Sequence, residues 1–123
     1  IYASHSFHEI TDYYPMRALR TKNHKFIWNI AWKLDSPFAS DLWHSISWQG
    51  AVRAGDSVFG ARSVDAYAHR PQFELYDLEN DPDEIVNLAG KPEFRDIVNR
   101  FVAKIKSFQA QTGDPWHHKW IYE

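Results

Sequence analysis

The chain has 123 residues, a length that fits one domain, and its 44% hydrophobic and 24% charged residues are ordinary for a folded protein. The absence of cysteine excludes disulfides, thiolate metal ligands and a cysteine nucleophile. The net charge of −2 offers no basic footprint for nucleic acid, and no run of about eighteen apolar residues predicts a membrane span.

Residues 1–14 mix polar and aromatic side chains without helical or strand periodicity, and we interpret this segment as an ordered loop. The sequence opens on Ile1, without a basic-then-apolar signal segment. We therefore expect it to be a piece of a longer protein.

Two extended segments are expected next, at residues 16–21 and 26–32, on either side of the polar Lys22-Asn23-His24. Apolar and β-branched residues beside a short polar break are typical of an antiparallel hairpin. Polarity alternates in the first segment, which predicts one solvent-facing side. The second is nearly all apolar, which predicts a central strand of a sheet.

Residues 34–70 are less regular. Asp35-Ser36-Pro37 indicates a turn, and residues 45–53 are compatible with a short helix ended by Gly55. Alternating polarity at residues 72–77 then predicts a half-buried strand.

The final part of the chain contains the clearest element. Pro92 suits a first helical turn and Gly113 a helix end. Between them, apolar side chains recur at helical spacing and form one stripe: Phe94, Ile97, Val98, Phe101, Val102, Ile105 and Phe108. The expected fold class is α+β, with a small antiparallel sheet of three to four strands packed against a long C-terminal helix. We expect residues 1–123 to form a single domain.

A long motif links the last predicted strand to this helix. It consists of Leu75-Tyr76-Asp77-Leu78, then Asp81-Pro82-x-Glu84, then Asn87-Leu88-Ala89. Asp and Asn side chains in such turns can accept hydrogen bonds from nearby backbone amides, so the residues themselves predict a scaffold.

As a pattern, this motif resembles the closing segment of the formylglycine-dependent sulfatases. The resemblance continues upstream, where residues 6–33 are most similar to the heparan N-sulfatase (sulfamidase, N-sulfoglucosamine sulfohydrolase) branch. The matching residues are Ser6, His8, Glu9, Thr11, Tyr14, Pro15, Met16, Arg17, Asn29 and Lys33, followed later by Asp114-Pro115-Trp116. The resemblance is weakest between Pro37 and His69, and Phe7 stands where animal enzymes of this branch carry a second histidine.

The resemblance implies that the chain is the C-terminal subdomain of a hydrolase that removes N-linked sulfate from glucosamine residues of heparan-type glycans. It also implies a partner, the protein's own N-terminal catalytic domain, where a formylglycine and a calcium ion are expected. This chain has no cysteine and no C/S-x-P-x-R motif, so it holds no catalytic residue or cofactor of its own and is expected to be inactive alone. Its localisation is expected to be lysosomal in animals and periplasmic or exported in bacteria.

The segment 1–14 is the part of the chain expected to reach the active site of the catalytic domain. His8 and Glu9 are the foremost substrate-binding candidates, because histidine can donate to sulfamate oxygens and glutamate can accept from sugar hydroxyls. His5 and Thr11 are included with them. The alternative is that His8 and Glu9 only tie a turn to the sheet. We expect Arg17 to form a structural ion pair rather than to anchor substrate.

Other functions remain open on sequence grounds. His5-x-x-His8 provides too few ligands for a metal site. The six tryptophans are also compatible with a stand-alone carbohydrate-binding module, although aromatic side chains fill small cores equally well. An O-sulfatase of the same family is the other alternative.

Overall fold

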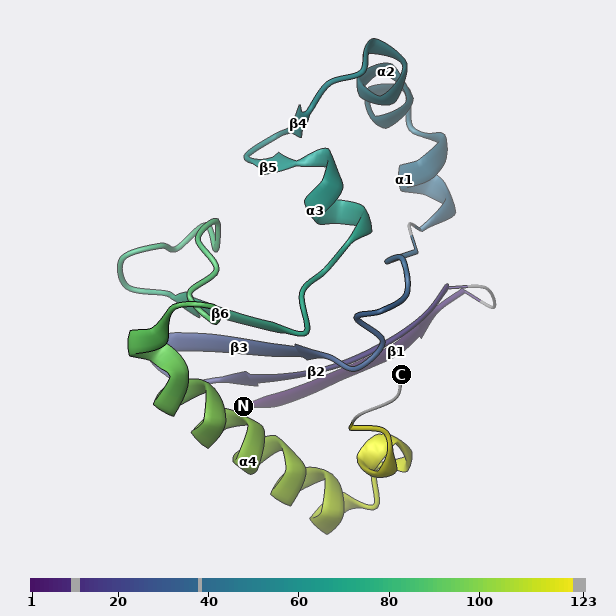
Figure 1. Ribbon diagram of the computed structural model, residues 1–123. Coiled ribbons are helices and arrows are strands. Elements are labelled where there is room, and N and C mark those ends of the chain that lie inside the picture. Colours follow the sequence, from purple (N-terminus) through teal and green to yellow (C-terminus); the bar gives the residue numbers. More distant parts are fainter. Residues whose placement is uncertain (10–11, 38, 121–123) are drawn as a thin grey trace.

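The computed structural model describes residues 1–9, 12–37 and 39–120, and it confirms the expected α+β class. A four-stranded antiparallel sheet has the order β1-β2-β3-β6. The long helix α4, Arg95–Thr112, lies along one face of this sheet (Figure 1). The strands are β1 (Tyr2–His8), β2 (Asp12–Arg20), β3 (His24–Asn29) and β6 (Phe73–Asp77).

The helix packs on the sheet through the apolar stripe expected from the sequence. Phe101 is 3% exposed and Ile105 1% exposed, and both belong to the main core. The sheet contributes residues that share the opposing face: Leu19, Phe26, Trp28 and Leu75. A short 3-10 turn, η1 (Pro92–Phe94), precedes the helix, and Gly113 ends it with a φ of 66° that favours glycine.

A separate lobe is inserted between β3 and β6 and projects from the other side of the sheet (Figure 1). The lobe has its own small core, in which Trp48, Phe59 and Tyr67 meet edge to face with ring centroids 5.2–5.9 Å apart. The backbone amide of Ser36 donates to the carbonyl of Ala68 at 2.7 Å and joins the two ends of the lobe. Its elements are α1 (Ser40–His44), α2 (Ile46–Ala54), β4 (Val58–Phe59), β5 (Arg62–Ser63) and α3 (Val64–Ala68).

The interpretation of residues 1–14 as a loop is wrong. Tyr2–His8 form an edge strand, β1, that pairs with β2, which itself begins at Asp12. An edge strand is held by backbone hydrogen bonds on one side, and most of its side chains are exposed. Its sequence therefore does not need to alternate between apolar and polar side chains, and that alternation is the signal on which the prediction relied.

The expected solvent-facing side of β2 is also wrong. Arg17 is only 6% exposed and Tyr14 only 2%, although they lie on opposite faces of the strand. The reason is that both faces are covered, one by α4 with the chain after it and the other by the segments that flank the lobe. The central strand is confirmed, but it ends at Asn29 instead of residue 32.

The motif between β6 and α4 is a scaffold, as its residues predicted. The Asn87 side chain accepts from the backbone amides of Leu75 and Ala89, both at 2.9 Å, and donates to the carbonyl of Phe73. The Asp81 carboxylate accepts from two further backbone amides in the same turn. These contacts lock the connection against β6.

Candidate functional site

The geometry of the first hairpin brings His5 and His8 to one face of the sheet. In a regular strand, residues three apart point to opposite faces. Here the pairing register shifts between His5 and Phe7, so that His5 pairs with Met16 and His8 with Asp12. Met16 and Asp12 line the same pocket, which shows that they share a face. Since cross-strand partners point the same way, both histidines lie on that face.

These side chains line a pocket of about 220 Å³ at the junction of the hairpin and the root of the lobe. The hairpin supplies one wall, the segment before α1 supplies a second, and Arg70, which lies shortly before β6, completes the lining. The lining residues are His5, His8, Asp12, Tyr14, Met16, Ser36, Pro37, Ala39 and Arg70. His5 is half-buried and His8 is exposed. The pocket therefore combines hydrogen-bond donors with a carboxylate, a mixture suited to a polar ligand.

Tyr14 is the most buried polar side chain of this pocket, at 2% exposed. Its hydroxyl has no hydrogen-bond partner among residues 1–9, 12–37 and 39–120. Burial raises the pKa of Tyr14 to about 12, an effect that nearby Arg70 opposes and Glu74 reinforces. The hydroxyl therefore stays protonated at neutral pH and can donate a hydrogen bond.

Arg70 is held in place by contacts on two sides. Its Nε donates to Ser36 Oγ at 3.3 Å, and its Nη1 lies 3.7 Å from Glu74 Oε1. Glu74 is itself 4% exposed and accepts hydrogen bonds from the Asn29 side chain at 2.7 Å and from the Tyr76 hydroxyl. The guanidinium is thus positioned before any ligand arrives.

Unlike the two histidines, Glu9 and Thr11 are not among the described residues that line the pocket. Glu9 lies in the turn with a left-handed φ of 61°, and its Oε1 accepts a hydrogen bond from Ser40 Oγ at 2.9 Å. This contact ties the hairpin to the lobe, whereas the alternative considered for Glu9 was a tie between the turn and the sheet. Substrate contact by Glu9 stays a prediction. Thr11 lies outside the described residues, so its substrate contact stays a prediction.

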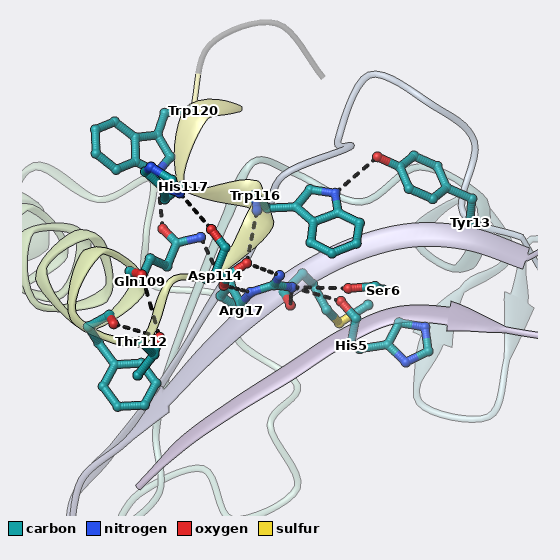
Figure 2. A network of polar contacts seen from close by, with 12 residues as sticks. His5, Ser6, Tyr13, Arg17, Gln109, Thr112, Asp114, Trp116, His117 and Trp120 are labelled. Atoms are coloured by element: carbon teal, nitrogen blue, oxygen red, sulfur yellow. Dashed lines mark hydrogen bonds and ion pairs between the residues drawn. The ribbon is translucent and has the colours of Figure 1, made fainter.

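Arg17 forms the expected structural ion pair on the other face of the sheet (Figure 2). Its Nη2 lies 2.7 Å from Asp114 Oδ1, its Nε donates to Oδ2, and its Nη1 donates to the His5 carbonyl. The Arg17 guanidinium is the main reason that the pKa of Asp114 falls to about 2. Trp116 continues this network to Tyr13, so the short turn η2 (Pro115–His118) folds back on the hairpin.

The sequence did not reveal Asp12, Tyr14 and Arg70 as pocket residues. Tyr14 was noted only as a residue that matches the N-sulfatase pattern. Arg70 directly follows the stretch of weakest resemblance, and its approach to the hairpin depends on how the lobe closes. Among the described residues, no group of three or more His, Asp or Glu side chains is arranged to hold a metal ion. In the same part of the chain, no helix is long and apolar enough to cross a membrane.

Comparison with known proteins supports the resemblance drawn from the motifs. No protein-family model matches the chain. A human N-sulphoglucosamine sulphohydrolase is 30% identical over 94% of this chain, and an ulvan-active sulfatase of Formosa agariphila is 27% identical over 85% of it. The matches cover only 24% and 19% of those two relatives, so the chain spans about a quarter of their length or less. The similarity to sulfatases is confirmed.

Proposed function

We propose that this sulfatase-related chain is the C-terminal part of a longer hydrolase that removes N-linked sulfate from glucosamine residues of heparan-type glycans. The observation that carries the proposal is the match to the human N-sulphoglucosamine sulphohydrolase along nearly the whole chain. The sequence motifs of residues 6–33 favour the same branch.

In this proposal the chemistry of sulfate removal belongs to another part of the protein. A formylglycine there would supply the nucleophile for sulfur, and a calcium ion would bind the sulfate oxygens. This chain has no cysteine and no C/S-x-P-x-R motif from which a formylglycine is made, so the isolated chain is inactive. Its role is to brace the catalytic domain and to present the pocket that contains His5 and His8 to the substrate.

The two histidines suit substrate contact for chemical reasons. An imidazole N–H donates a hydrogen bond to a sulfamate or hydroxyl oxygen, and a cationic donor makes a shorter and stronger bond to an anion. His8 is exposed at the pocket rim, where it can meet a ligand held by a neighbouring domain.

The second relative favours one alternative. Because its name identifies a sulfatase active on ulvan, an O-sulfated polysaccharide is a second candidate substrate. A stand-alone carbohydrate-binding module is the other alternative. Trp28 and Trp48 are each 2% exposed and fill cores, whereas Trp32 and Trp43 are 38% and 47% exposed.

The test compares substrates with the full-length protein that contains this chain. Release of sulfate is measured from N-sulfoglucosamine and from an O-sulfated glucosamine of matched size. Preferential release from the N-sulfated sugar supports the proposal, and preference for the O-sulfated sugar replaces it with the alternative. Loss of activity on both sugars, with a folded protein that carries formylglycine, contradicts both candidates.

A further inference from the structure

We infer that Tyr14 and Arg70 form the floor of a subsite that binds one anionic oxygen group of a sugar ligand, a sulfate or a carboxylate. The inference deepens the proposed function and rests on it for the identity of the ligand. Neither residue was singled out by the sequence motifs as a ligand contact.

The subsite is assembled from segments that are distant in the chain. Tyr14 comes from the interior of β2, Arg70 from the residues that enter β6, and Ser36 from the segment that leaves β3. The Arg70 guanidinium lies 3.7 Å from the buried carboxylate of Glu74. Here it shares the lining of one pocket with Tyr14 and with both histidines.

The buried Tyr14 hydroxyl is the strongest sign of a ligand. Buried polar groups in folded proteins nearly always have a hydrogen-bond partner, and an unpaired one lowers stability. Within the described part of the chain this hydroxyl has none. A ligand oxygen in the pocket would supply the missing acceptor, so the unfavourable burial would be relieved when the ligand binds.

The charges around the pocket define the chemistry of the ligand. Arg70 is the permanent cation of the lining, its side chain is 27% exposed, and the Glu74 carboxylate lies 3.7 Å from its Nη1. Asp12, 8% exposed, is the carboxylate of the lining. An anionic group placed toward Arg70 and Tyr14, with the rest of the ligand lying toward Asp12, gives the guanidinium a counter-charge and the hydroxyl an acceptor. A sugar that carries a sulfate or a carboxylate has this arrangement.

The decisive experiment is a titration of the full-length protein that contains this chain, followed by NMR of selectively labelled tyrosine and arginine residues. The probes are N-sulfoglucosamine, glucuronate and the uncharged sugar N-acetylglucosamine. The first two separate a sulfate from a carboxylate as the bound group. We expect saturable shifts around Tyr14 and Arg70 with at least one of the two anionic sugars, and weaker binding of the uncharged sugar.

Variants show whether the shifts report this subsite. Arg70→Gln should weaken binding by about 10- to 100-fold and Tyr14→Phe by about 2- to 10-fold, as expected for the loss of a charged and of a neutral hydrogen bond. The matched control is Arg53→Gln, on the exposed side of α2, which should bind as the unchanged chain does. Arg70→Lys keeps the charge and replaces Arg70→Gln if that variant fails to fold.

The inference is overturned if no probe gives saturable shifts. It is also overturned if Tyr14→Phe and the Arg70 variant bind as tightly as Arg53→Gln. These results are separate from those of the sulfate-release assay. Binding to the subsite without sulfate release by the full-length protein would retain the subsite and reject the proposed function. Release of sulfate by the full-length protein without binding to the subsite would retain the proposed function and reject the subsite.

Discussion

Arg17 and Asp114, 97 residues apart in the sequence, form a bidentate ion pair that joins β2 to the chain directly after α4. Both side chains are largely buried, with 7% and 13% of their surface exposed. Gln109 and the backbone amide of Trp116 also donate to the Asp114 carboxylate. The pair therefore holds the chain after α4 against the hairpin that carries His5 and His8.

Replacing Asp114 by Asn should destabilise the fold, because it leaves the Arg17 guanidinium buried without a counter-charge. We expect the free energy of unfolding to fall by about 3 kcal/mol. Urea unfolding measures this change. Asp96→Asn, on the exposed first turn of α4, is the matched control and should change stability by less than about 1 kcal/mol. Equal effects of the two variants would contradict the structural role of the pair.

The same ion pair should make stability depend on acid pH. The pKa of Asp114 is lowered from 3.8 to about 2 in the folded state, chiefly by Arg17. A lowered pKa contributes stability that is fully present above the unfolded pKa and is lost as pH falls through the folded one. The contribution of about 2 kcal/mol should therefore disappear between about pH 4 and pH 2. Unfolding free energies of the unchanged chain and Asp114→Asn should converge there, and a constant difference would count against the assigned shift.

Asn87 offers a test of the scaffold assigned to the motif before the long helix. Asn87→Ala removes three hydrogen bonds to the backbone of Phe73, Leu75 and Ala89 and leaves those partly buried groups unpaired. We expect a loss of about 2 to 3 kcal/mol in unfolding free energy. Asn99→Ala, at an exposed position of α4, serves as the control and should be neutral or slightly stabilising. A loss below about 0.5 kcal/mol for Asn87→Ala would mean that the motif is not a scaffold.

His8 and Glu9 should differ in their effect on activity, although they are adjacent in sequence. In the full-length protein, His8→Ala should lower kcat/KM for the N-sulfated sugar by about 10-fold or more, because His8 lines the pocket. Glu9→Ala should act only through its hydrogen bond to Ser40, so Ser40→Ala should reproduce its effect. A large loss for Glu9→Ala that Ser40→Ala does not share would restore Glu9 as a direct substrate contact.

The sequence predicted the parts of the fold that depend on regular burial. The stripe from Phe94 to Phe108 could be recognised as a helix because one face of it is buried along its whole length. The helix ended by Gly55 was also confirmed, as α2 with a left-handed glycine after it. The strand β1 was missed because an edge strand is held by backbone hydrogen bonds, so its sequence does not need alternating apolar side chains.

The pocket could be predicted only in part, for a related reason. His5 and His8 were candidates because they lie in a segment that resembles the N-sulfatases. Their common face depends on the register shift between His5 and Phe7, which no spacing in the sequence indicates. Arg70 joins them because the inserted lobe closes through Ser36 and Ala68, and a contact between such distant segments leaves no local pattern.

The central claim is that the pocket between the first hairpin and the lobe contacts the substrate of a sulfatase. A crystal structure of the full-length protein with N-sulfoglucosamine bound would test it most directly. We predict that sugar or sulfo oxygens lie within hydrogen-bond distance of His8 and of Arg70. A fully occupied sugar in the catalytic site that leaves both side chains without a ligand contact would contradict the account.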